Sequence, residues 1–176
     1  VFNGGATSDP YLGKANGVGD IEYLSAPAPI EIGNRVWNDY DEDGIQDAGE
    51  VGIDGITVQL YEGSTLVGTT ATTNSGQWYF NDSNTTGGLK PNTTYTVRVQ
   101  SNAGQILTGT NTDGTTNGDL RDSDASLVGG NAEITYTTGN YGENNHTLDI
   151  GFRVIVPDLS LTKTVSNAIV ALNGTV

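Results

Sequence analysis

The chain has 176 residues and a formal net charge of -14, with 21 acidic residues against 7 lysines and arginines. This charge disfavours a nucleic-acid partner and an anionic membrane surface, because both need clustered basic side chains, and it favours cation binding. Cysteine is absent, so no disulfide supports the fold, and no apolar run approaches the ~20 residues of a membrane span. The length suits one sizeable domain with extensions.

After residues 1–30, which differ in composition, short runs of alternating apolar and polar residues dominate the chain. Residues 1–30 are rich in Gly, Ala, Ser and Pro and are interpreted as a linker or the tail of an upstream region. Further on, Ile56, Val58 and Leu60 alternate with polar residues, as in a strand with one buried and one solvated face. The spacing of such runs predicts an all-β sandwich. Strands are expected at residues 31–37, 56–62, 65–73, 76–80, 93–100, 132–138 and 147–155.

Two segments fall outside this series. Residues 101–130 are polar and rich in turn formers, and are interpreted as a functional or a disordered loop. Near the end, Leu159 and Leu161 alternate with polar residues as in one more strand. Residues 157–176 are therefore predicted to be a strand-like arm or the start of a following repeat domain, and the sandwich is expected at residues 31–156.

The acidic loop, residues 39–50, holds six carboxylates and no basic residue. Its spacing matches the calcium-binding pattern D-x-[DN]-x-[DN]-G-x5-E at every constrained position. A hard cation takes about six to eight oxygen ligands at ~2.3–2.6 Å, and alternate residues of a tight loop converge on one point. The predicted calcium ligands are the side chains of Asp39, Asp41, Asp43, Asp47 and Glu50, and the backbone carbonyl of Ile45.

Two other interpretations of the acidic loop stay open. One is a solvated acidic turn, and the other is Mg²⁺, which requires a smaller octahedral shell and keeps its waters. Glu42 is off the ligand positions and is expected to face water. Because both flanks read as strands, the loop lacks the helix pair by which calcium sensors open and close. The predicted role of the metal is structural: it would tie down a loop at one end of the sandwich.

The stretch from Ile32 to Glu62 closely resembles the opening signature of the SdrD B-like domains of bacterial cell-surface proteins. The later GQWYF, LKPNTTYTV, DSDAS and LDIGF match that family too, so the resemblance covers about residues 31–155. It implies a Greek-key β-sandwich of the collagen-adhesin B-type, prealbumin-like kind, calcium-dependent rigidity and a place in tandem arrays that project an adhesive tip. Residues 157–168 are similar to the first strand of another surface-protein repeat domain.

A second acidic cluster is formed by Asp119, Asp122 and Asp124, and Asp149 is expected to approach it if the last strand ends beside it. The resemblance implies additional calcium sites, so these four residues are candidate ligands of a second one. A solvated loop is the alternative, because the cluster fills no complete ligand pattern.

Other candidate residues favour structural roles. His146, the only histidine, lies in a polar run and is expected to be exposed rather than catalytic. Trp37 and Trp78 lie in strand-like runs and are predicted to pack in the core or at its rim. Related collagen-adhesin domains often carry a Lys–Asn isopeptide bond from a first-strand lysine. The first strand here has no lysine, so no such bond is expected within the sandwich.

These observations favour a non-catalytic, calcium-stabilised module of an extracellular or secreted cell-surface protein, acting as a stalk or spacer in adhesion. Its expected partners are neighbouring domains or subunits of a surface assembly, and a host or cell-surface ligand. The alternative is a subunit of an extracellular filament or tube in which a terminal strand is donated to a neighbour. A ligand-binding adhesin head is a third hypothesis. An enzyme is the least favoured class, because no nucleophile elbow or phosphate-binding glycine motif is visible.

Overall fold

The computed structural model describes residues 27–100, 104–115 and 118–154. The predicted C-terminal arm and nearly all of the predicted N-terminal linker lie outside these ranges. The described elements are β1 (Ile32–Asn38), β2 (Thr57–Glu62), β3 (Thr65–Ala71), β4 (Gln77–Phe80), β5 (Thr94–Val99), β6 (Gln105–Leu107), the 3-10 helix η1 (Gly118–Leu120), β7 (Ser126–Val128), β8 (Asn131–Thr137) and β9 (Ile150–Val154).

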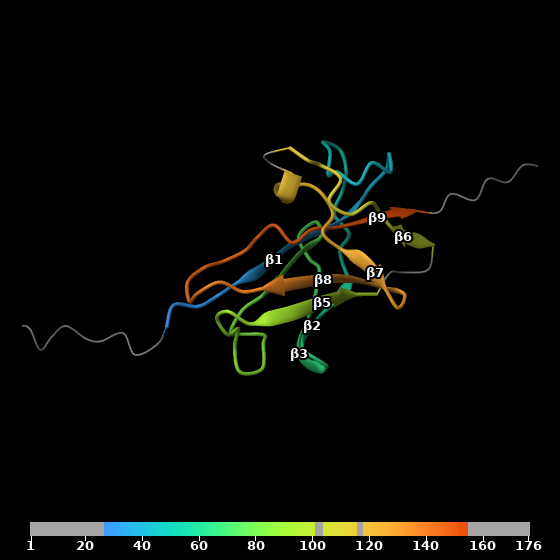
Figure 1. The fold of residues 1–176 in the computed structure, drawn as a ribbon. Coiled ribbons are helices and arrows are strands. Elements are labelled where there is room, and N and C mark those ends of the chain that lie inside the picture. The colour runs from blue at the N-terminus through green and yellow to red at the C-terminus, as the bar shows by residue number, and fades with distance from the viewer. Residues whose placement is uncertain (1–26, 101–103, 116–117, 155–176) are drawn as a thin grey trace, which may run out of the picture.

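The strands form two sheets, seen as two layers in Figure 1. One sheet has the order β4-β1-β9-β6 and the other has the order β3-β2-β5-β8-β7. The first and last strands, β1 and β9, are parallel neighbours, with Val36 opposite Ile150, whereas the other strand pairs are antiparallel. The predicted all-β sandwich is confirmed. Because β1 and β9 run parallel, the chain enters β1 at one end of the sandwich and leaves β9 at the opposite end (Figure 1).

Both sheets contribute to one hydrophobic core. Alternation places Val58 and Leu60 of β2 on the same face of their sheet as Val97 of β5, and all three are buried. Ile150 and Phe152 of β9, which belongs to the other sheet, are buried in the same core. The alternating runs in the sequence therefore identified the faces that turn inward.

The two tryptophans are core residues. Trp37 and Trp78 are both buried, and the Trp78 ring lies 5.9 Å from that of Phe80 in an edge-to-face arrangement. A Cβ atom at Gly151 would lie 2.8 Å from the Trp37 ring and 2.5 Å from the methyl group of Thr108. The glycine of the LDIGF run is thus required for β9 to approach these side chains.

The prediction of an irregular loop over residues 101–130 was wrong in part. Its described residues form β6, η1 and β7, which add one edge strand to each sheet. Each of the two strands has only three residues, so neither is long enough to show a clear alternation in the sequence.

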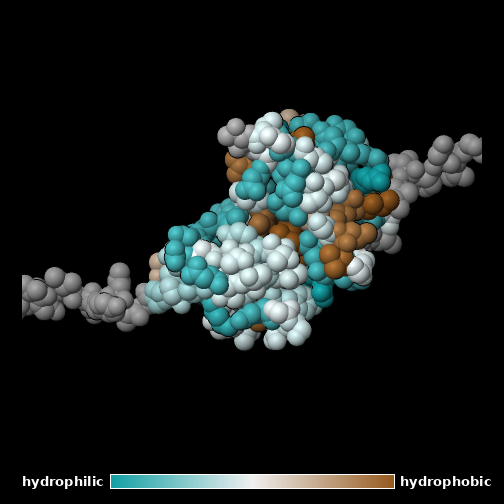
Figure 2. All heavy atoms as spheres, in the orientation of Figure 1, coloured by the Kyte–Doolittle hydropathy of each residue, from teal (hydrophilic) through white to brown (hydrophobic). Residues whose placement is uncertain are grey.

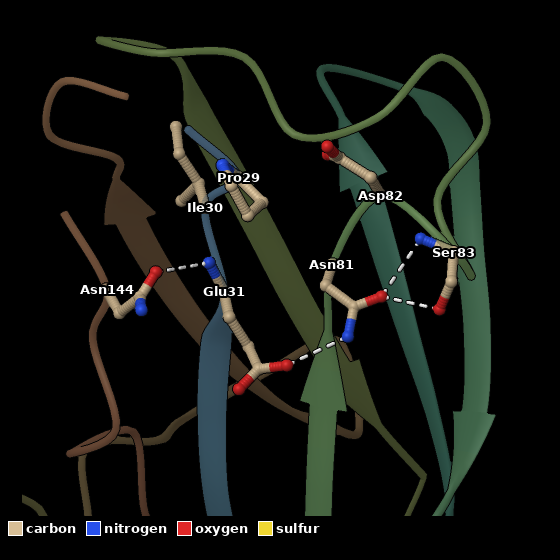
Figure 3. A pocket seen from close by; sticks show the side chains of 7 residues that line it. All are labelled: Pro29, Ile30, Glu31, Asn81, Asp82, Ser83 and Asn144. Carbon is tan, nitrogen blue, oxygen red and sulfur yellow. Dashed lines mark hydrogen bonds between the residues drawn. The ribbon is translucent and has the colours of Figure 1, made fainter. Parts of the chain in front are cut away.

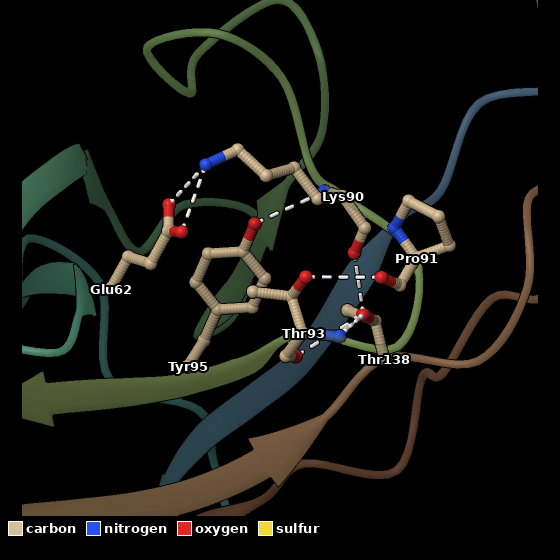
Figure 4. A network of polar contacts seen from close by, with 6 residues as sticks. All are labelled: Glu62, Lys90, Pro91, Thr93, Tyr95 and Thr138. Carbon is tan, nitrogen blue, oxygen red and sulfur yellow. Dashed lines mark hydrogen bonds and ion pairs between the residues drawn. The ribbon is translucent and has the colours of Figure 1, made fainter.

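A polar network fixes the turn that leads into β5 (Figure 4). The Lys90 ammonium group pairs with Glu62 at 2.7 Å, and the Tyr95 hydroxyl accepts a hydrogen bond of 3.0 Å from the Lys90 amide. Thr138 donates to the Lys90 carbonyl at 2.6 Å, and its hydroxyl accepts from the Thr93 amide at 3.0 Å. The lysine is therefore a surface tether between β2 and the β5 turn.

Candidate metal centre

The acidic loop leaves β1 at one end of the sandwich, beside the segment that carries η1 (Figure 1). The Asp39 amide donates to the Phe152 carbonyl at 2.9 Å, which attaches the start of the loop to β9. Gly44 has φ +83°, and a Cβ atom there would lie 2.9 Å from the Gly109 carbonyl. The sharp turn expected at the sixth loop position is therefore present, and it needs glycine.

Three predicted ligands converge. Asp39, Asp41 and Asp43 each place a carboxylate oxygen within 4.8 Å of the other two. Asp39 is only 2% exposed, and its carboxylate accepts hydrogen bonds from the amides of Glu42, at 2.7 Å, and Gly44, at 2.9 Å. Among the described residues, no lysine or arginine forms an ion pair with these three carboxylates. The crowded negative charge fits a cation between the oxygens.

The far end of the loop is closed by Glu50. Its two carboxylate oxygens accept hydrogen bonds from the Tyr40 amide, at 2.7 Å, and the Asp47 amide, at 3.0 Å. Glu50 thus reaches back across the loop, as a ligand at position twelve must. The carboxylates of Asp47 and Glu50 lie outside the group of converging oxygens, so their predicted ligand role, and that of the Ile45 carbonyl, stays a prediction.

Glu42, expected to face water, lies at the surface and has φ +67°. Its carboxylate forms an ion pair of 2.6 Å with Arg153 on β9. This pair ties the back of the acidic loop to the sheet without placing a basic group among the converging oxygens.

The second acidic cluster is assembled from distant segments. Asp124 and Asp149 bond to each other twice: the Asp149 amide donates to the Asp124 carboxylate at 2.7 Å, and the Asp124 amide donates to the Asp149 carbonyl at 2.9 Å. Asn34 of β1 donates to the Asp149 carboxylate at 2.9 Å. Asp119 is held at the rim by the Thr147 hydroxyl, at 2.9 Å. Asp149, the residue before β9, therefore lies beside Asp124.

Two buried carboxylate oxygens in this cluster lack a protein partner. Asp122 is 2% exposed and Asp149 is 0% exposed, and in each the Oδ1 atom has no hydrogen-bond donor among the described residues. An unpaired buried anionic oxygen is costly, and a cation would compensate it. Among the described residues, however, only Asp39, Asp41 and Asp43 bring three carboxylates within 4.8 Å of one another, so a second metal position stays a prediction.

Burial dominates the electrostatics of the cluster. It raises the pKa of Asp149 to about 8, and the nearby charge of Asp124 adds to the shift. Burial likewise raises the pKa of Asp124 to about 7, opposed by the hydrogen bond from the Asp149 amide and reinforced by the charges of Asp119 and Asp122. The pKa of Asp122 is raised, first by burial. Without a cation, the protein therefore favours protonation of these acids.

The two acidic segments share backbone hydrogen bonds. The Gln46 amide donates to the Arg121 carbonyl at 2.7 Å, and the Ser123 amide donates to the Gly44 carbonyl at 3.2 Å. The Thr108 hydroxyl, next to β6, donates to the Asp39 carboxylate. Thr108 and Asn34 were not predicted as site residues, because their role depends on contacts across the fold and on no local spacing.

The opposite end of the sandwich holds a cavity of about 410 Å³ (Figure 3). Its polar groups are bonded to one another: Glu31 accepts from the Asn81 side chain at 2.8 Å, and the Glu31 amide donates to Asn144 at 2.8 Å. His146 is exposed, as expected, and pairs with Glu31 at 3.1 Å. None of the described lining residues has a buried side-chain polar atom without a hydrogen-bond partner, so the cavity gives no sign of a ligand.

A two-sheet β-sandwich with acidic loops gathered at one end defines the class of protein. The family profile of the SdrD B-like domain matches residues 30–152, and the chain belongs to this family. It is 32% identical over 151 residues to serine-aspartate repeat-containing protein E of Staphylococcus aureus strain USA300, covering 85% of this chain and 11% of that protein.

Other relatives extend the comparison. Bone sialoprotein-binding protein of Staphylococcus aureus strain MRSA252 is 33% identical over 151 residues, covering 85% of this chain and 12% of the relative. Colossin-C of Dictyostelium discoideum is 46% identical over 78 residues, covering 43% of this chain and 8% of the relative. The chain thus spans about a tenth of the length of these relatives. Within the described ranges, no helix has the length and apolarity to cross a membrane.

Proposed function

We propose that the chain is a calcium-stabilised structural module of an extracellular cell-surface protein, acting as a stalk or spacer in adhesion and performing no catalysis. Membership of the SdrD B-like family supports the structural role, and so do relatives whose names include a serine-aspartate repeat protein and a bone sialoprotein-binding protein. The proposed partners are neighbouring domains or subunits of a surface assembly and a host or cell-surface ligand.

The observation that carries the calcium proposal is the convergence of the Asp39, Asp41 and Asp43 carboxylates within 4.8 Å. In the proposed site, Asp47, Glu50 and the Ile45 carbonyl complete the oxygen shell. A second ion would be held by Asp119, Asp122, Asp124 and Asp149, where two buried oxygens lack donors. Calcium fits better than magnesium because it accepts six to eight oxygens in an irregular shell, whereas magnesium requires a near-ideal octahedron and keeps several waters.

The mechanical role follows from where the ions would bind. Both acidic segments lie at one end of the sandwich and join β1, β9 and the segment from β6 to β7. A cation shared by such segments removes their mutual repulsion and links elements that are distant in sequence. The module would then resist bending at this end, as a spacer requires.

Scanning calorimetry with calcium, with magnesium and with EGTA tests the proposal. Binding to the folded state alone should stabilise it by about 2.7 kcal/mol when free calcium is a hundredfold above the dissociation constant, so the melting temperature should rise. Magnesium at equal ionic strength should raise it much less. An unchanged melting temperature at millimolar calcium would contradict the proposal.

A further inference from the structure

One carboxylate of the acidic loop is held from outside the loop. Asp39, the buried member of the three converging acids, accepts hydrogen bonds from the amides of Glu42 and Gly44, which belong to the loop itself. A third bond comes from the hydroxyl of Thr108, 69 positions further along the chain, and it reaches the same oxygen, Oδ2, as the Gly44 amide. Among the described residues, no other side chain from outside the acidic loop bonds to the three converging carboxylates.

The other two converging acids are less constrained. The Asp43 carboxylate accepts a hydrogen bond of 2.8 Å from the Ile45 amide inside the loop, and the Asp41 carboxylate accepts none from the described residues. Both side chains are exposed, and Figure 2 shows hydrophilic residues gathered over this end of the sandwich. The converging group therefore has one fixed member, Asp39, and two that can adjust to an ion.

Thr108 is itself fixed by the sheet. It follows β6 directly and is buried, and its amide donates to the Gly151 carbonyl of β9 at 3.0 Å. Its methyl group packs against Gly151, because a Cβ atom there would lie 2.5 Å from it. A β-branched side chain is stiff at χ1, so a methyl group held against β9 keeps the hydroxyl directed at the Asp39 carboxylate.

The segment that follows Thr108 also contacts the acidic loop. A Cβ atom at Gly44 would lie 2.9 Å from the Gly109 carbonyl and 2.6 Å from the Thr112 hydroxyl. The loop thus rests on residues 108–112 at its turn as well as at its buried acid. A carboxylate that can rotate loses orientational freedom when it binds a cation, and a donor that fixes it beforehand removes that cost.

We propose that Thr108 is the positioning residue of the acidic-loop metal centre: its hydroxyl fixes the Asp39 carboxylate toward the point where the three carboxylates converge, and so raises calcium affinity. This role rests on the proposed calcium function and belongs to a residue outside the ligand pattern. Loss of the outer hydrogen-bond partner of a metal ligand typically lowers metal affinity about 10–100-fold. Because Thr108 is anchored to β9, the packing of the sheet then determines how well the loop binds its ion.

Isothermal titration calorimetry of the full chain with calcium tests this role, and Asp41→Asn identifies the binding step that belongs to the acidic loop. Thr108→Val keeps the shape of the side chain and removes the hydroxyl, so it should weaken that step about tenfold or more. Thr108→Ser keeps the hydroxyl and should recover most of the lost affinity. This rescue separates positioning from packing, because serine lacks the methyl group that contacts Gly151.

Thr110→Val is the matched control. It removes a hydroxyl from the same segment, one that donates to the Ala125 carbonyl and not to a predicted ligand. It should lower the calcium-free urea midpoint without changing the acidic-loop step. Should Thr108→Val fail to fold by circular dichroism, Thr108→Ala takes its place, with the same expected loss of affinity.

Three outcomes would overturn the role of Thr108 alone. The first is a Thr108→Val protein that binds calcium as tightly as the wild type or more tightly. The second is a Thr108→Ser protein that binds as weakly as Thr108→Val, which would assign the effect to packing. The third is an equal loss of affinity in Thr110→Val. A wild type that binds no calcium is a different result, because it contradicts the calcium proposal itself and this role with it.

Discussion

Neighbouring acidic residues of the acidic loop have different roles. Asp39 is buried and accepts the amides of Glu42 and Gly44, so it shapes the turn even without a cation. Asp41 is exposed, and among the described residues its carboxylate accepts no hydrogen bond. The Asp41 carboxylate is therefore free to bind a metal, and removing its charge should leave the turn intact.

Asp41→Asn tests this division. The variant should lower calcium affinity about tenfold, or about 1.4 kcal/mol, because calcium affinity depends on the number of charged ligands. Its calcium-free stability should change by no more than about 0.5 kcal/mol, as for most surface substitutions. Isothermal titration calorimetry and urea unfolding measure the two quantities.

Glu42→Gln is the matched charge control, since it removes one charge from the same loop at an exposed position off the ligand pattern. It also removes the ion pair with Arg153, so its calcium-free stability is measured together with its calcium affinity. It should leave calcium affinity close to that of the wild type. Equal losses in the two variants would show that only the overall charge of the loop matters.

At the scale of the elements, one buried threonine holds the segment that joins the acidic loop to β2. The Thr72 hydroxyl, just after β3, donates to the Ile53 carbonyl at 2.6 Å and accepts from the Ile56 amide at 2.9 Å. Thr72 is buried, so water cannot replace these bonds. A single side chain thus joins the end of the acidic segment to the β2–β3 hairpin.

Thr72→Val should destabilise the protein by about 1–3 kcal/mol, because it keeps the shape of the side chain and leaves a buried donor and acceptor unpaired. The urea midpoint measures the loss. Thr69→Val, exposed on β3, should shift it little. If both variants lower the midpoint equally, the Thr72 hydroxyl is not the anchor.

At the scale of the whole molecule, the second acidic cluster links stability to pH. In the calcium-free protein the pKa values of Asp149 and Asp124 rise from an ordinary 3.8 to about 8 and about 7, chiefly through burial. Between about pH 4 and pH 8 the folded state then binds more protons than the unfolded state. The free energy of unfolding must therefore fall as pH rises through this range.

Chemical unfolding in calcium-free buffer at several pH values should show this decline, and Asp149→Asn should flatten it. Calcium should remove most of the decline at neutral pH, because the bound ion takes over the role of the proton. A calcium-free protein whose stability rises steadily from pH 4 to pH 8 would contradict the assignment of these acids as a buried, cation-dependent group.

The sequence by itself determined what is encoded locally. Alternation at Val58 and Leu60 identified strand faces, and the spacing of Asp39, Asp41 and Asp43 predicted a loop whose oxygens converge. Both patterns follow from backbone periodicity, which acts over a few residues. The Ile32–Glu62 signature then pointed to the family that the profile match shows.

Only the tertiary structure decided which distant segments meet. It placed Thr108 against Asp39 and Asn34 against Asp149, and it brought Asp149 to Asp124, which the sequence made conditional on where the last strand ends. It also made β6 and β7 edge strands of the two sheets. Such contacts join residues separated by 25 to 115 positions, and their energy depends on the complete packing of two sheets, so no short pattern in the chain records them.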